Sequence, residues 1–235
     1  MQIDFTDRHV IVTGGTGALG GAVVEVLVAA GAICHLPAHR QPDPAKFPLA
    51  RHERVRLTPG IDLTNESAVV SFYAALPALY ASVHAAGAFD MAPIAEASLE
   101  SFRRMLEVNV VTCFLCCREA VRKIRATGAS DGGRIVNVGS KPALVPTGGM
   151  SGYAAAKAAV AALTLGLSEE LAAERIWVNA VIPSTMDTPP NRRAMPKADF
   201  DKWPKVEEVA ATVAFLASPQ NAVTRGALVP VYGRS

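Results

Sequence analysis

The sequence has few charged residues and no marked excess of either sign. Of its 235 residues 19% are charged, with 23 Lys and Arg against 21 Asp and Glu. This balance argues against nucleic acid or an anionic membrane as the main partner. Half of the residues are hydrophobic, so the chain can bury a large core, and global disorder is excluded. The length favours one large domain, which we expect to span residues 1–235.

The sequence also lacks long apolar runs. No stretch of ~18 apolar residues is uninterrupted, because Glu25, Glu107 and Lys157 break the best candidates. The first ten residues contain neither the cationic nor the apolar segment of a secretory leader. We therefore expect a cytoplasmic protein that does not cross a membrane.

Cysteines are few, and three of the four lie close together. They are Cys34, Cys113, Cys116 and Cys117. The segment 113–117 has no second CxxC and no histidine at a metal-ligand spacing. We interpret these residues as small apolar side chains on a helix in a reducing compartment and predict no metal site. A zinc or redox role is the alternative.

Short apolar runs alternate with amphipathic segments along the chain. The expected strands are 9–15 (with its closing glycine turn), 32–37, 54–58, 79–87, 133–140, 175–183 and 227–232. The expected helices are 17–30, one starting at Thr64, 98–126, 151–174 and 206–218, with Ser98, Ser101 and Ser151 as cap candidates. Segments 38–53 and 184–204 have no clear period. Continuously apolar strands predict an α/β fold of the Rossmann type, with a doubly wound parallel sheet and helices on both faces. Ligands of such sheets bind beyond the carboxyl ends of the strands.

A glycine motif follows the first expected strand. Residues 15–20 read GTGALG, a GxGxxG between a strand and a helix. Glycines allow a pyrophosphate to approach the backbone, and the helix N-terminus supplies amide donors. We interpret the motif as a dinucleotide site; a tight structural turn is the alternative.

The end of the second expected strand bears on the choice of cofactor. It reads Pro37-Ala38-His39-Arg40, and no acid appears before Asp43. An acid there would favour NAD, whereas a cation suits the 2′-phosphate of NADP. We predict NADP(H), with Arg40 and His39 on the phosphate; NAD stays possible, and so does a solvated loop cation.

Tyr153 and Lys157 are spaced so that both lie on one helix face. A phenol has a pKa of about 10, too high for acid–base work near neutrality. An ammonium about 6 Å away, at an effective dielectric constant of about 20, favours phenolate by roughly 2.8 kcal/mol, or about two pK units. We predict Tyr153 as general acid/base; the alternative is an exposed polar pair.

Two further polar residues accompany this pair. Ser140 ends an expected strand, where its hydroxyl could stabilise a developing oxyanion, or could be an ordinary strand-end residue. Asn109 lies in an apolar helical stretch. Its amide is either structural or holds a water beside Lys157.

Together these motifs resemble the short-chain dehydrogenase/reductase family over nearly the whole chain. TGGTGALG (13–20) resembles its glycine-rich turn, HAAG (84–87) stands where the family has NNAG, and VNAVIPSTMDT (178–188) resembles the segment after the sixth strand. The order and spacing of Asn109, Ser140, Tyr153 and Lys157 match its catalytic tetrad. Three departures are Ala18 in the turn, HAAG for NNAG, and Ser184 for glycine.

The resemblance implies the following roles. Tyr153 is the acid/base, Lys157 lowers its pKa and binds the nicotinamide ribose, Ser140 orients the substrate oxygen, and Asn109 supports a relay water. The implied cofactor contacts are Gly14, Thr16, Gly17, Ala18, Leu19, His39, Arg40, Asp62, Leu63, Ala86, Gly87, Tyr153, Lys157, Pro183 and Thr188, with Asp62-Leu63 at the adenine and Thr188 at the carboxamide.

We expect an NADP(H)-preferring oxidoreductase that acts on a small carbonyl or alcohol. A non-catalytic NAD(P)-binding sensor is the alternative, and an epimerase or dehydratase fits the short chain less well. The expected pocket walls are 141–150, 89–91 and a substrate loop at about 184–204. Arg192 and Arg193 either grip an anionic substrate or are solvated.

The composition of one helix bears on assembly. Residues 154–166 are apolar almost all round, which normally means burial on every side. A single domain offers no further layer, so a second subunit should cover this helix and the one at 98–126. We predict a homodimer or homotetramer.

Overall fold

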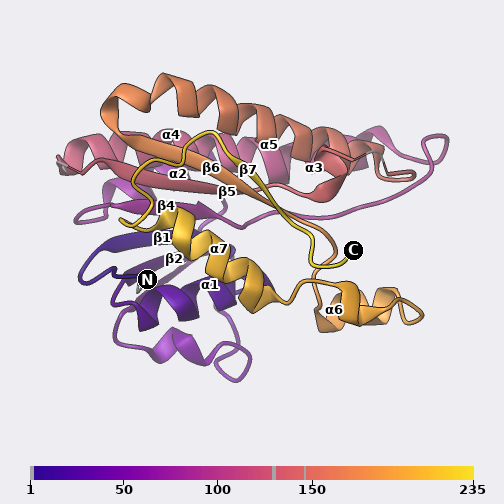
Figure 1. Cartoon of the computed structure of the whole chain (residues 1–235), viewed down its shortest axis with the longest axis horizontal. Coiled ribbons are helices and arrows are strands. Elements are labelled where there is room, and N and C mark those ends of the chain that lie inside the picture. The colour runs from indigo at the N-terminus through magenta and orange to yellow at the C-terminus, as the bar shows by residue number, and fades with distance from the viewer. Residues whose placement is uncertain (1–2, 129–130, 146) are drawn as a thin grey trace.

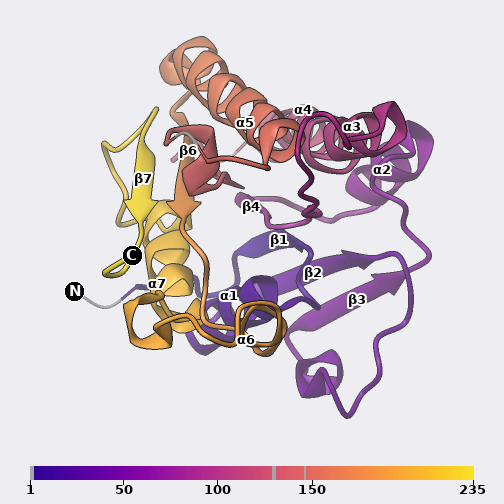
Figure 2. The same cartoon turned by 90° about the vertical axis from the view of Figure 1, so that its right-hand side faces the viewer.

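The centre of the protein is a parallel sheet of seven strands. The computed structural model describes residues 3–128, 131–145 and 147–235. The strands are β1 (His9–Thr13), β2 (Ile33–Ala38), β3 (Val55–Pro59), β4 (Ala81–His84), β5 (Gly133–Val138), β6 (Ile176–Pro183) and β7 (Leu228–Val231). Their order is β3-β2-β1-β4-β5-β6-β7 (Figures 1 and 2). The order reverses direction between β1 and β4, where open α/β sheets bind ligands. The predicted fold class is confirmed.

Helices cover both faces of the sheet. On one face lie α1 (Ala18–Ala29) and α7 (Val206–Ala217); on the other lie α2 (Glu66–Ala74), α4 (Thr112–Thr127) and α5 (Ser151–Glu170) (Figure 2). Two shorter helices are α3 (Leu99–Leu106) and α6 (Pro189–Ala194). Single helical turns are η1 (Pro48–Arg51), η2 (Glu107–Val111), η3 (Lys141–Ala143), η4 (Ala172–Glu174) and η5 (Phe200–Lys202). No helix among the described residues is long and apolar enough to span a membrane.

Alternating side chains of the interior strand β1 divide the core in two. Val10 and Val12 of β1 pack with α1 and α7, whereas Ile11 between them packs with the helices of the other face. This is the two-residue period of a strand with helices on both sides. Each layer is therefore anchored to the strand that ends in the glycine turn.

The long helix expected at 98–126 is not a single regular α-helix. It consists of α3, a π-helical turn η2 and α4 in direct succession. Ser98 caps its start, since its Oγ accepts a hydrogen bond from Ser101 N at 3.0 Å. The expected cap at Ser151 is wrong, because Met150 precedes α5 without a side-chain cap. The helix expected from Thr64 starts at Glu66, with Asn65 as its cap.

The expectation of an irregular segment at 184–204 is also corrected. This segment contains α6 and the turn η5. Thr188 accepts a hydrogen bond from Asn191 N at 3.3 Å, and prolines occupy the first helical positions, where no N–H is needed. The polar, proline-rich sequence has no helical period, so the short capped helix α6 was not predicted. The segment 38–53, by contrast, contains only η1, as expected.

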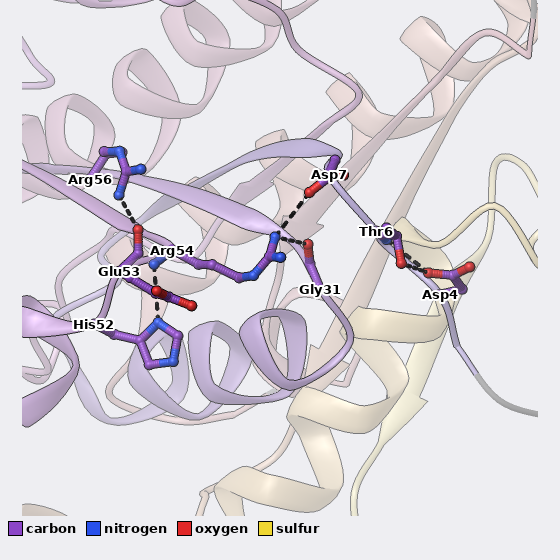
Figure 3. A network of polar contacts seen from close by, with 8 residues as sticks. All are labelled: Asp4, Thr6, Asp7, Gly31, His52, Glu53, Arg54 and Arg56. Carbon is purple, nitrogen blue, oxygen red and sulfur yellow. Dashed lines mark hydrogen bonds and ion pairs between the residues drawn. The ribbon is translucent and has the colours of Figure 1, made fainter.

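Polar contacts fix the amino end of the edge strand β3. Figure 3 shows the guanidinium of Arg54 reaching the carbonyl of Gly31 at 2.9 Å and the carboxylate of Asp7 at 3.2 Å. His52 Nδ1 accepts a hydrogen bond from Arg54 N at 3.1 Å. These contacts join β3 to the turn between α1 and β2. They lie at the end of the sheet opposite the candidate site, whose loops follow the carboxyl ends.

Candidate active site

The glycine turn after β1 is held close to the segment after β4. Gly14 has φ +65°, and a methyl group on its Cα would lie 2.8 Å from Ala86 N. A methyl group on Gly20 would lie 2.1 Å from the Gly14 carbonyl oxygen. Thr13 Oγ1 accepts a hydrogen bond from Ala86 N at 3.2 Å. Gly14 therefore allows the turn to pack against the segment containing Ala86, and Gly20 allows the turn itself to close.

The N-terminus of α1 fits the phosphates of a dinucleotide. Gly17 is its cap residue, no side chain caps the amides, and the first turn has no acidic residue. Thr16, Gly17 and Ala18 are exposed, whereas Leu19 is buried. The free amides and the positive end of the helix dipole suit an anion. Because Ala18 is exposed, its methyl group replaces glycine without entering the core.

Two basic side chains lie exposed at the carboxyl end of β2. His39 and Arg40 follow directly after Ala38. The nearby acid Asp43 accepts a hydrogen bond from Ala45 N at 2.9 Å. The carboxylate of Asp62 also binds its own loop. It accepts hydrogen bonds from Thr64 N and Thr64 Oγ1, and these bonds lower the pKa of its carboxyl. The next residue, Leu63, packs against the core.

Ser140, Tyr153 and Lys157 converge at the carboxyl end of β5. The Ser140 side chain lies close enough to the Tyr153 phenol to lower its pKa. Lys157 Nζ donates to the Val138 carbonyl at 2.9 Å and lies 5.9 Å from the centre of the Tyr153 ring. The edge of Phe89 packs on that ring, with 5.0 Å between ring centres. The exposed polar pair considered from the sequence is wrong for Lys157, which is buried.

The expected lowering of the Tyr153 pKa does not occur in the protein alone. Burial raises the pKa of Tyr153, and the nearby Ser140 side chain only opposes that effect. Burial also lowers the pKa of Lys157 to about 8. The Lys157 ammonium points to the Val138 carbonyl, so the loss of water around the phenolate outweighs its attraction.

Asn109 lies in the π-helical turn and forms hydrogen bonds with the segment after β4. Its Nδ2 donates to the carbonyls of Ala88 and Met105, each at 3.0 Å, and its Oδ1 accepts from Ala88 N at 3.3 Å. A methyl group on Gly87 would lie 2.6 Å from Asn109 Oδ1 and 3.4 Å from Lys157 Nζ. Of the two readings of Asn109, these contacts support the structural one; the relay water remains a prediction.

The segment after β6 is tied to its own loop and to the C-terminal strand. Pro183 ends β6, and Ser184 Oγ donates to the Tyr232 carbonyl at 3.0 Å. Thr188 is buried and caps α6, so its contact with a carboxamide stays a prediction. Arg192 forms two hydrogen bonds with Asp187, at 2.6 and 2.7 Å. Both arginines are exposed, but Arg192 is held by this ion pair and is not a free substrate clamp.

A cavity of about 310 Å³ lies beside Tyr153. It is lined by Asp90, Met91, Ala92, Ile94, Ala97, Ser98, Leu99, Ser101, Phe102, Met105, Gly149, Met150, Ser151, Gly152 and Tyr153. The expected walls at 89–91 and 141–150 therefore contribute in part, although Pro146 lies outside the described residues. No residue of 184–204 lines this cavity, contrary to expectation.

Sequence reasoning missed the contribution of α3 to the cavity. Phe102 and Met105 lie three residues apart and so face the same side of a helix. That spacing was the available signal. An apolar pair at the start of a helix is ordinarily assigned to the core, so nothing in the sequence marked it as a pocket wall.

Comparisons with known proteins agree with this geometry. The sequence profile of the short chain dehydrogenase family matches residues 8–199. Cis-4-hydroxycyclohexanecarboxylate dehydrogenase of Sinomonas cyclohexanicum is 32% identical over 244 residues, covering 97% of this chain and 96% of that protein. A 2,5-dichloro-2,5-cyclohexadiene-1,4-diol dehydrogenase of Sphingobium indicum is 32% identical over 199 residues, covering 82% and 78%. The structure of a short-chain type dehydrogenase/reductase from Mycobacterium ulcerans has a TM-score of 0.87 at 27% identity, covering 99% and 90%.

The chain therefore belongs to the short-chain dehydrogenase family. It is an oxidoreductase that acts on CH–OH or C=O groups with a nicotinamide dinucleotide. The alternative of a non-catalytic sensor is not favoured, because these relatives are named as dehydrogenases.

Proposed function

We propose that this protein is an NADP(H)-preferring dehydrogenase of neutral secondary alcohols, or reductase of the matching ketones, on a compact apolar carbon frame. The observation that carries this proposal is the cavity of about 310 Å³, which has Tyr153 as one wall and apolar side chains as most of the others. A cavity of this size suits a small ring rather than a long chain.

Tyr153 and Ser140 would hold the substrate oxygen. The nicotinamide cofactor, when bound, donates or accepts the hydride. In reduction the Ser140 hydroxyl hydrogen-bonds to the carbonyl oxygen as it gains charge, and Tyr153 OH delivers its proton to that oxygen. In oxidation Tyr153 removes the alcohol proton. Lys157 would bind the cofactor ribose and keep Tyr153 oriented.

The raised pKa of Tyr153 affects the two directions differently. Burial keeps the phenol protonated, which suits proton donation to a ketone. Oxidation needs the phenolate, so it should require a higher pH than reduction. The nicotinamide ring is cationic only in the oxidised cofactor, which would therefore favour the phenolate in the oxidation direction.

The charge of the cavity supports a neutral substrate. Asp90 is the one charged residue among those that line it, and its carboxylate accepts hydrogen bonds from Met91 N and Ser101 Oγ. No lining residue is Lys, Arg or His, so a substrate carboxylate would have no partner. The named substrates of two relatives are substituted six-membered carbon rings, which fits the proposed frame. The first of these substrates carries a carboxylate, for which the described residues that line the cavity of this protein offer no cation.

The NADP preference rests on the end of β2. His39 and Arg40 are exposed where the adenosine ribose would lie, and the carboxylate of Asp43 is engaged with Ala45 N. A 2′-phosphate would therefore meet cations and no free acid.

We also propose a cytoplasmic homodimer or homotetramer. All four cysteines are free thiols, as suits a reducing compartment. Ala155, Ala158, Ala162 and Leu165 of α5 form an exposed apolar stripe that a second subunit would cover.

Turnover of cyclohexanone and cyclohexanol with NADP(H) or NAD(H) tests the reaction. Tyr153→Phe should lose about 10²–10⁴-fold in kcat, as expected for removal of a general acid/base, and keep its affinity for the cofactor. The matched control is Tyr80→Phe. The Tyr80 hydroxyl is buried with no hydrogen-bond partner among the described residues, and it precedes β4 at the other end of the sheet. Equal activity of Tyr153→Phe and wild type would refute the assignment. Turnover of 4-oxocyclohexanecarboxylate at least as fast as that of cyclohexanone would refute the neutral substrate class.

A further inference from the structure

A second cluster of chemically competent side chains lies in the core, apart from the substrate cavity. His84 ends β4, and Cys113 and Cys117 lie one helical turn apart on α4. All three are buried. Their possible ligand atoms lie within 4.8 Å of one another. The sequence showed no histidine at a metal-ligand spacing because His84 is brought to the cysteines only by packing of α4 on the sheet.

The distances within this cluster are close to those of a tetrahedral metal site. The two sulfurs are 4.0 Å apart, and Cys117 Sγ lies 3.4 Å from His84 Nδ1. In a tetrahedral site, metal–sulfur bonds of about 2.3 Å place two sulfurs about 3.8 Å apart. With a metal–nitrogen bond of about 2.0–2.1 Å, a sulfur and a nitrogen lie about 3.5 Å apart. The third pair, Cys113 Sγ and the His84 nitrogen, lies within 4.8 Å. A metal ion would therefore bind after small shifts of Cys117 and His84 and an approach of Cys113 toward the imidazole.

Asn137 of β5 supplies an oxygen as the fourth ligand atom. Its Oδ1 lies 2.8 Å from His84 Nδ1, 3.3 Å from Cys113 Sγ and 3.5 Å from Cys117 Sγ. Without metal, Oδ1 accepts hydrogen bonds from the imidazole and from both thiols. An ion would replace the three protons, with Oδ1 as the fourth vertex, and the two shortest contacts would lengthen by several tenths of an ångström. The set of two sulfurs, one nitrogen and one amide oxygen is closed by protein on every side.

Neighbouring side chains orient both the imidazole and the amide. His84 Nε2 and Ser82 Oγ are 2.8 Å apart, and Ser82 Oγ is 3.1 Å from Tyr73 OH. Without metal, Nδ1 carries the proton, because it lies 2.8 Å from the acceptor Asn137 Oδ1. Metal binding would move that proton to Nε2, which would donate it to Ser82 Oγ and leave the Nδ1 lone pair for the ion. Asn137 Nδ2 donates to Thr164 Oγ1 at 2.9 Å, which keeps Oδ1 toward them. Such outer contacts are typical of metal ligands.

Charge and softness select the class of ion. Two thiolates balance a divalent cation, so the complex with neutral imidazole would bury no net charge. Sulfur and nitrogen ligands favour zinc-like ions over magnesium or calcium. We propose that His84, Cys113 and Cys117 bind one divalent zinc-class ion, with Asn137 Oδ1 as the fourth ligand. The site is structural, because it has no open position for substrate, and it joins β4, β5 and α4.

Binding exchanges protons for the metal. The two thiols lose their protons, both sulfurs form bonds to the ion, and two protons are released to solvent for each ion bound. No oxidant takes part. Because the ligands are buried, the ion enters during folding or through local opening of α4.

Cobalt(II) is a suitable probe, because thiolate ligands give it a charge-transfer absorption. The reduced full-length chain is refolded with Co²⁺ or Zn²⁺, passed over a desalting column and assayed for metal content. Wild type should retain one ion per chain, show the thiolate–cobalt absorption and release two protons per ion. Cys117→Ser and His84→Asn should lose at least 90% of the retained metal. Cys116→Ala is the matched control and should retain it, because Cys116 is a buried cysteine of the same helix outside the cluster.

Circular dichroism and NADPH binding establish that each variant is folded. Folded wild type that retains no metal and shows no cobalt–thiolate absorption overturns the proposal. Retention in His84→Asn and Cys117→Ser equal to that in Cys116→Ala also overturns it, since the ion would then lie elsewhere. The metal content is independent of turnover, so loss of the proposed enzymatic function would not affect this test.

Discussion

A stacked pair of histidines should make the stability of this protein depend on pH. His9 and His35, on the neighbouring strands β1 and β2, have ring centres 5.1 Å apart, with 2.8 Å between His9 Nδ1 and His35 Nε2. Burial, together with the charges of His9 and Arg56, lowers the pKa of His35 from 6.5 to about 4. His35 is therefore neutral in the native protein near neutral pH. Protonating both rings would place two cations in contact.

The sign of the effect follows from the proton uptake of each state. The unfolded chain protonates His35 at pH values below about 6.5, whereas the native chain does so only near pH 4. The unfolded state thus binds more protons between these values, and the free energy of unfolding falls as the pH falls. The stabilisation is fully present above pH 6.5 and is lost progressively toward pH 4. Between pH 7.5 and pH 5 the expected loss is about 2 kcal/mol.

Urea unfolding at several pH values and fixed protein concentration measures this loss. His35→Gln should remove most of the dependence between pH 7.5 and 5, since glutamine does not titrate. His52→Gln is the matched control, because His52 is exposed and outside the pair. Carboxylates titrate in all three proteins, so the difference between curves isolates His35. Parallel curves for wild type and His35→Gln would refute the reasoning.

Three further predictions concern the cofactor and the assembly. Arg40→Ala should reduce the ratio of kcat/KM for NADPH over NADH at least about tenfold, because a charge-assisted hydrogen bond contributes roughly 1.5–3 kcal/mol; an unchanged ratio would remove Arg40 from the phosphate site. Gly14→Ala should weaken NADPH binding in a fluorescence titration, since its methyl group would lie 2.8 Å from Ala86 N; unaltered affinity would contradict the close packing of the turn. Light scattering should give two or four times 24.6 kDa, and Leu165→Glu should shift the protein toward monomer, whereas a wild-type monomer would refute assembly through α5.

The sheet and the residues that meet at its carboxyl edge were predicted from the sequence, because both depend on local signals. Each apolar strand is followed by glycine, proline or a polar turn, and parallel strands align their carboxyl ends. The convergence of Ser140, Tyr153 and Lys157 follows from that arrangement. The direction of the Tyr153 pKa shift was not predicted correctly. The estimate for Tyr153 counted one charge at a fixed distance, whereas burial of the phenol has the larger effect.

Contacts between distant segments account for the remaining differences. Nothing near Arg192 in the sequence indicates whether it is free; the structure pairs it with Asp187 and places it over Phe200, so it cannot be assumed to meet substrate. The substrate cavity depends on α3 packing beside the start of α5, and the metal cluster on α4 packing against β4. Contacts between segments so far apart in the sequence leave no periodic pattern in it. They can be identified only from the three-dimensional structure.

The π-helical turn links the two candidate sites through helix geometry. Met105, Asn109, Cys113 and Cys117 recur every four residues and are all buried. In a regular α-helix a four-residue step overshoots one turn by about 40°, so twelve residues would rotate the last of these side chains by about 120° from the first. The i→i+5 bonding of the turn at Glu107–Val111 takes up one more residue and opposes that drift. Asn109 can therefore hold the chain beside Lys157, while Cys113 and Cys117 face His84 in the core. A straight helix from Ser98 to Ala126, as the periodicity suggested, would turn one of these sets away from the sheet.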